Sequence, residues 1–227
     1  MRTSGGRRPA VADVVDPGAA DTRHVVVWDF DSPVMSISSA PVGGGVASLN
    51  WVVNVGVTAG YERTDLDEHA ADIAHRVGVE GTGASLFTAA DVRRIVRRSD
   101  GDGQDGTVVV DATVGVTKPT WAAGPDGSHG SRAEGGWVPG TINLVVQLPV
   151  ALTPAAAVNA VMTVTEAKAQ ALIEHDVPGT GTASDAVVVC WPPTLPAEVF
   201  AGPRSPWGAR IARATHAAVT VGLEAHP

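Results

Sequence analysis

The sequence is poor in the residues that build covalent and metal-bound frameworks. Of its 227 residues one is a cysteine, Cys190, which excludes an intrachain disulfide and a cysteine-based zinc cluster. No apolar run approaches the roughly 20 residues of a membrane-spanning helix. Two arginines near the start are not followed by an apolar segment, so we predict no signal peptide and a cytoplasmic protein. The net charge of −8 argues against nucleic acid as the main partner.

Lysine is also rare, and its two positions are informative. The chain has fourteen arginines but only two lysines, Lys118 and Lys168. Lysine gives up its proton on burial far more readily than arginine, so the two are not interchangeable. The choice of lysine over arginine at residues 118 and 168 therefore marks these two positions as candidates for a role that needs a lysine.

The pattern of apolar residues predicts a single mixed α/β domain, with a central sheet and packed amphipathic helices. Strands are expected at residues 24–30, 85–87, 107–116, 141–150 and 185–190, with 33–39 as a hairpin or sheet neighbour of the first. Helices are expected at 66–77, 153–175 and 207–223. Residues 1–22 are expected to be a flexible tail, and the domain to span 23–227. The basic run 92–98 is interpreted as a solvated helix face, and His69 and His75 as surface histidines.

The expected helix over 153–175 carries Lys168 on its apolar face. Residues in a helix advance about 100° each, which places a polar stripe at Asn159, Thr163, Glu166, Gln170 and Glu174. Lys168 falls on the opposite stripe with Val161, Val164 and Leu172. A lysine in that position must find a partner or lose its charge. We therefore expect Lys168 to be buried and Glu166 to be exposed.

General catalytic motifs are absent from the sequence. There is no GxSxG elbow, Walker loop, HExxH motif, or GxGxxG after a strand. Thr165 and Lys168 have the spacing of an SxxK dyad, but a match of this length has little specificity. No cluster of histidine, cysteine and carboxylate residues has ligand spacing, so no metal site is predicted.

Seven segments together resemble the adenosylcobinamide amidohydrolase family of corrinoid salvage. They follow the order of the family and are SSAPVGGGVASLN (38–50), SLFTAADV (85–92), VDATVGVTKP (110–119), GTINLVV (140–146), TPAAAVNAVMTVTEAKAQAL (153–172), GTGTASDAVVV (179–189) and AGPRSPWGARIARATHAAV (201–219). The resemblance implies a hydrolase that cleaves the amide between the aminopropanol arm and the corrin ring. Its products would be adenosylcobyric acid and 1-amino-2-propanol, with the corrinoid as substrate and no separate cofactor. The chain departs from the family at Ser184, where a threonine is expected, and at 119–121.

Amide hydrolysis needs an activated nucleophile and hydrogen-bond donors for the developing oxyanion. Lys168 is a candidate general base if neutral, or an electrostatic anchor if paired with Asp185. Asn143 is a candidate oxyanion donor and Thr141 a candidate nucleophile, since both alternate onto one face of their strand. The alternative for Asn143 and Thr141 is an ordinary hydrogen bond at the edge of the sheet.

Substrate binding is expected from the two Gly-rich turns, whose backbone amides can approach the many carboxamides of a corrinoid. The residues assigned to it are Ser38, Ser39, Gly44, Asn50, Thr180, Gly181 and Thr182. The loop 117–139, with Trp121 and Trp137 near its ends, is expected to cover the macrocycle.

A corrinoid-binding protein without turnover, a carrier or sensor, is the competing hypothesis. A structural or oligomerising protein is less favoured, because long Gly/Thr-rich loops add little to a scaffold. The sequence leaves open the oligomeric state and the need for the upper adenosyl ligand.

Overall fold

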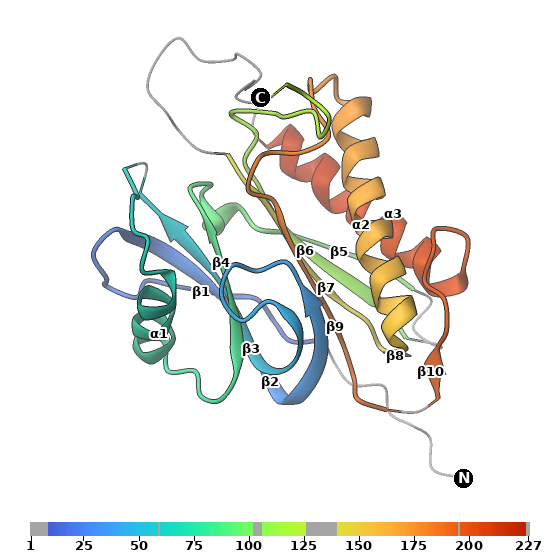
Figure 1. Ribbon diagram of the computed structural model, residues 1–227, viewed down its shortest axis with the longest axis horizontal. Helices are drawn as coiled ribbons and strands as arrows, with labels where there is room; N and C mark the ends of the chain where they lie inside the picture. Colours follow the sequence, from blue (N-terminus) through green and yellow to red (C-terminus); the bar gives the residue numbers. More distant parts are fainter. Residues whose placement is uncertain (1–8, 59, 102–105, 126–139, 195, 226–227) are drawn as a thin grey trace.

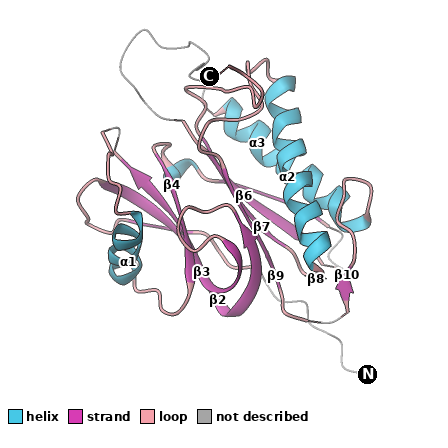
Figure 2. Ribbon diagram, in the orientation of Figure 1, coloured by secondary structure: helices cyan, strands magenta, loops and turns pink. Residues whose placement is uncertain are grey.

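The computed structural model describes residues 9–58, 60–101, 106–125, 140–194 and 196–225. It confirms the expected mixed α/β domain, with three α-helices among these residues (Figure 2). The elements in order are β1 (Asp13–Val15), β2 (Thr22–Ser38), β3 (Gly45–Val57), α1 (Leu66–Val77), β4 (Gly83–Thr88), the 3-10 turn η1 (Val92–Arg94), β5 (Val96–Asp100), β6 (Val108–Val114), β7 (Ile142–Gln147), β8 (Ala151–Leu152), α2 (Pro154–Glu174), β9 (Ala186–Trp191), β10 (Ala197–Glu198) and α3 (Pro206–Glu224). Within this part of the chain, no helix is long and apolar enough to cross a membrane.

One bent strand, β2, joins the two halves of the main sheet. The strand order is β4-β3-β2-β9-β7-β6-β5, and β1 pairs with the first half of β2. β2 pairs with β3 along its length but with β9 only through Met35–Ser38. The two strands expected at 24–30 and 33–39 are therefore a single strand. A register shift between Asp29 and Val34, a segment that contains Pro33, marks the irregularity where such strands bend.

The bend stacks the two halves of the sheet and produces four layers, helix–sheet–sheet–helix. Along β2, Val26 and Trp28 point into the space between the half-sheets, whereas Val25 and Val27 pack with α1 residues on the outside. α1 covers one outer face, and α2 and α3 cover the other (Figure 1). The layout explains why the strands β6, β7 and β9 are buried on both faces.

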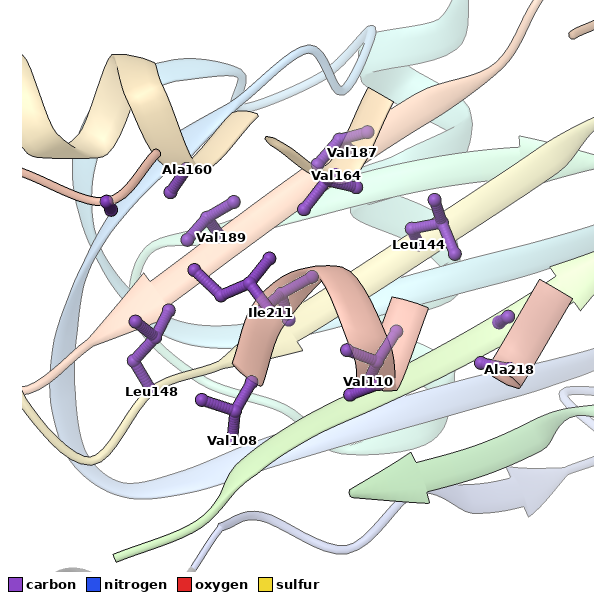
Figure 3. Close-up of a cluster of buried hydrophobic side chains, with 14 of the residues drawn as sticks. Val108, Val110, Leu144, Leu148, Ala160, Val164, Val187, Val189, Ile211 and Ala218 are labelled. Atoms are coloured by element: carbon purple, nitrogen blue, oxygen red, sulfur yellow. The ribbon is translucent and has the colours of Figure 1, made fainter. Parts of the chain in front are cut away.

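The core beneath α2 and α3 positions the elements that carry the candidate site. Val164 of α2 and Ile211 of α3 pack against Leu144, Val187 and Val189 of the sheet (Figure 3). Each fully buried side chain of this kind contributes about 1.5–3 kcal/mol relative to an exposed one. On α3, the buried residues include Ile211, Ala214, Ala218 and Val219.

Ordered structure begins before the expected domain boundary at residue 22. β1 pairs with Val25–Val27, and Ala10 exchanges two hydrogen bonds with the side-chain amide of Gln147. Residues 9–22 of the expected tail thus contribute a strand and hydrogen bonds to the sheet, and residues 1–8 lie outside the described part of the chain.

The basic run 92–98 is not a helix face. It forms η1 followed by the edge strand β5, where Arg97 makes a two-pronged ion pair with the buried carboxylate of Asp111. His69 also differs from expectation, since it is fully buried between Tyr61 and Thr22. Both errors arise because the contacts with Asp111 and Thr22 are tertiary and lie outside the reach of helical periodicity.

Candidate functional site

Lys168 and Asp185 form an ion pair where the second half of α2 passes the start of β9. Their side chains are each 10% exposed. Glu166, two residues away on the same helix, is exposed. The burial predicted from helical phase is confirmed for both charged residues. Thr163 differs from that prediction, because it is buried and donates to the carbonyl of Ala201.

The carboxylate of Asp185 accepts hydrogen bonds from three different elements. The backbone N–H of Ile142 donates to Oδ1 at 2.8 Å, and the hydroxyl of Thr182 donates to the same oxygen at 2.5 Å. Oδ2 accepts from the backbone N–H of Thr182 at 3.0 Å and from Lys168 Nζ. These contacts tie α2, the turn before β9 and the start of β7 together. We call this ion pair, together with the hydrogen bonds of Asp185, the anchor.

Gly181 covers the ion pair directly. A Cβ on this residue would lie 2.4 Å from Asp185 Oδ2 and 2.6 Å from Lys168 Nζ. Gly181 also forms a bridge with Thr120, whose backbone N–H donates to its carbonyl at 2.8 Å. Thr180 accepts from the backbone N–H of Ala122. Residues 180–182, expected to bind substrate, are thus engaged with the protein itself in this conformation.

Thr141 and Ser184 present a hydroxyl pair beside this anchor. Thr141 is buried at the start of β7, and its Oγ1 lies 2.7 Å from Ser184 Oγ. Ser184 is exposed and immediately precedes Asp185. Sequence reasoning noted Ser184 only as a departure from the family pattern and did not assign it to the site. Its position next to the candidate Asp185 was the available signal.

Asn143 lies between the two half-sheets, on the face of β7 that points away from α2. Its amide group donates to Asn54 Oδ1 at 2.9 Å and to the carbonyl of Phe87 at 3.1 Å. Asn54 in turn donates to Thr113. Both amide hydrogens of Asn143 are therefore occupied, and neither is free for an oxyanion in this conformation.

The remaining expected binding residues separate into two groups. Ser39 is exposed and close to the anchor, since its backbone and side chain hydrogen-bond with Val187, two residues after Asp185. Ser38 is buried, and its hydroxyl accepts a hydrogen bond from the N–H of Ala40 in the following turn. Gly44 packs closely against the backbone of Ala40. Asn50 holds the turn before β4 by accepting from the N–H of Thr82, so it is not part of the cluster around Asp185.

Cys190 is a structural thiol rather than a nucleophile. It is buried in β9, and that burial raises its pKa to about 12. In the described parts of the chain, no group of three or more histidine, cysteine and carboxylate side chains could hold a metal ion. In the expected lid, Trp121 is exposed, and Trp137 with the rest of 126–139 lies outside the described residues.

Fold and site together define a four-layer α/β domain in which Gly- and Thr-rich segments meet around a buried ion pair. The family model described as adenosylcobinamide amidohydrolase matches residues 12–227. The chain therefore belongs to the adenosylcobinamide amidohydrolase family, as the seven segments indicated.

Curated relatives carry the same description. An adenosylcobinamide amidohydrolase from Halobacterium salinarum is 31% identical over 173 residues, covering 72% of this chain and 73% of that protein. One from Methanosarcina mazei is 26% identical over 213 residues, covering 90% and 95%. Among solved structures, the PH0078 protein from Pyrococcus horikoshii aligns with a TM-score of 0.46 and 10% identity, covering 95% of this chain and 83% of that one.

Proposed function

We propose that this protein hydrolyses the amide that joins the aminopropanol arm to the corrin ring of adenosylcobinamide. One water is consumed, the C–N bond breaks, and the products are adenosylcobyric acid and 1-amino-2-propanol. The family match over residues 12–227 is the observation that carries the proposal. The adenosylcobyric acid would then re-enter coenzyme B12 assembly.

The Lys168–Asp185 pair acts in this proposal as a positioning device. Asp185 holds the N–H groups of Ile142 and Thr182, and through them the ends of β7 and of the turn 179–184. Those two ends carry the hydroxyls of Thr141 and Ser184. The exposed Ser184 hydroxyl is then placed to meet the substrate amide, with the buried Thr141 hydroxyl behind it.

One observation favours the competing function of a corrinoid carrier or sensor. Thr141 and Ser184 are hydrogen-bonded to each other, and within the described ranges of the chain neither hydroxyl is hydrogen-bonded to a base. Efficient amide hydrolysis by a hydroxyl requires a base within hydrogen-bonding reach. If no such group reaches the pair when the corrinoid binds, the protein retains its ligand without turnover.

A product assay tests the proposal. Purified protein is incubated with excess adenosylcobinamide, and corrinoids and amines are separated by chromatography with mass detection. Adenosylcobyric acid and aminopropanol should form in equal amounts, over many turnovers, and not with heat-unfolded protein. Tight binding without product would contradict hydrolysis and support the carrier or sensor. The cytoplasmic location and the lack of a cofactor remain predictions.

A further inference from the structure

An apolar groove of about 360 Å³ lies where α2 begins, far along that helix from Lys168. Met35 and Ile37 of β2 form one wall, and Ala157 and Val158 of α2 form another. Trp191 and the prolines that follow it complete the lining. Among the described residues that line the groove, none is charged. Its volume lies in the range of small-molecule sites, roughly 300–1,000 Å³.

The groove and the Asp185 cluster lie along the same pair of strands, β2 and β9. Met35 pairs with Trp191 and Ile37 with Val189, so the β2–β9 pair runs from the groove toward Asp185. Side chains two residues apart share a face of a strand, which places Asp185 on the same face as Val189 and Trp191. From Val189 to Asp185 the strand advances about 13 Å, at about 3.3 Å per residue.

We propose that this groove binds the apolar macrocycle of the corrinoid, with the aminopropanol arm directed past Ile37 and the exposed Ser39 toward Ser184 and Asp185. The inference rests on the proposed function, which supplies the substrate. A corrinoid combines a broad, methyl-bearing ring with long amide arms, and so requires an apolar surface connected to a polar one. The uncharged lining meets the first requirement, and the cluster about 13 Å away meets the second.

The lining residues suit a large flat ligand. Met35 has a flexible thioether side chain that adapts to irregular apolar shapes. Trp191 is 5% exposed and offers part of an indole ring at the groove. Val158 and Val46, which stand on opposite walls, are 51% and 69% exposed. A ligand seated between them would remove both valines from water.

Two lining variants and one matched control test the proposal. Val158→Asp and Val46→Asp place a carboxylate on either wall, whereas Met162→Asp does so one turn further along α2, outside the groove. Met162 is 53% exposed and Val158 51%, so the two α2 variants are matched in exposure and differ in whether the residue lines the groove. The probe is adenosylcobyric acid, which has already lost the aminopropanol arm, and its Kd is measured by equilibrium dialysis. Hydrolysis of adenosylcobinamide gives KM for the same proteins.

Val158→Asp and Val46→Asp should each raise Kd and KM about tenfold or more, because a ligand of apolar surface must then desolvate a carboxylate. Met162→Asp should match the wild type. Unchanged values in the lining variants, or an equal loss in Met162→Asp, would overturn the proposal. The proposal would also be overturned if the lining variants changed only the self-association of the protein, measured by analytical ultracentrifugation. The groove would then be an interface between copies of the chain.

The proposed function and the groove fail in different ways. A wild type that hydrolyses substrate while the lining variants keep its Kd and KM refutes the groove alone. A wild type that binds without product, with binding lost in the lining variants, supports the groove and refutes hydrolysis. A wild type that neither binds nor hydrolyses corrinoid refutes both.

Discussion

Replacing Lys168 by methionine distinguishes between two roles of this residue, as the positioning partner of Asp185 or as a catalytic base. Methionine keeps the length and the apolar character of the side chain, so the helix packing around residue 168 should survive. What the change removes is the cation beside Asp185. The carboxylate would retain the N–H of Ile142 and both donors of Thr182.

The structure allows the cost of this substitution to be worked out. Removing one partner of a buried ion pair typically destabilises a protein by about 3–5 kcal/mol. The three retained donors still stabilise the charge of Asp185. The expected loss of folding free energy is therefore at the lower end, about 3 kcal/mol. For a chain of this size, each kcal/mol lowers Tm by about 2–4 °C, so Tm should fall by roughly 6–12 °C. Adding Asp185→Asn to Lys168→Met should restore part of that loss, because the unpaired charge disappears.

Thermal unfolding and turnover are measured on the same samples, with Glu166→Gln as the matched control. If Lys168 only positions the site, turnover per folded molecule should fall modestly; if it is the base, turnover should fall on the order of a hundredfold or more. Glu166 is exposed, so its substitution should change neither quantity appreciably. A Lys168→Met protein with wild-type Tm and wild-type turnover would refute both roles. An inactive but stable Glu166→Gln protein would show that the wrong face of α2 has been chosen.

Three further predictions follow from the same structure. Gly181→Ala should lower stability by about 1–3 kcal/mol, because its Cβ would overlap Asp185, whereas Gly60→Ala, with open space around it, should be close to neutral in urea unfolding. Burial, followed by the charge of Arg63, lowers the pKa of His69 below its ordinary value of 6.5. The unfolded chain then binds more protons than the native one, so stability should be unaffected well above pH 6.5 and fall as the pH drops below it. His69→Gln should flatten that dependence in urea midpoints measured at several pH values, and an unchanged slope would contradict the assignment. Turnover should persist in a metal chelator, and a loss restored by one added metal would disprove metal-independent catalysis.

Local signals were sufficient where the interactions themselves are local. α1 spans Leu66–Val77 as expected, and α2 begins after Thr153, whose side chain accepts from the N–H of Ala156. Helical phase also separated Lys168 from Glu166 correctly. Caps and periodicity act over a few residues, so the sequence contains all that determines them.

Prediction failed where a neighbour distant in the chain decides the environment. Thr163 lies on the expected polar stripe of α2, yet the segment at Ala201 covers it and accepts its hydrogen bond. Val158, an apolar residue of the same helix, is half exposed at the groove. One periodic pattern describes a helix packed on one side, whereas α2 contacts both the sheet and α3.

The candidate site itself depends on the order of the strands in the sheet, which local sequence patterns do not indicate. β9, although it follows β7 and α2 in the chain, inserts between β2 and β7, parallel to β7 and antiparallel to β2. That insertion alone brings Asp185 to the N–H of Ile142 and Ser39 to Val187. The strand that completes the sheet therefore also connects the apolar groove to the hydroxyls of Thr141 and Ser184. Because one strand carries both ends, substitutions at the anchor that shift the start of β9 should alter corrinoid binding at the groove as well as turnover.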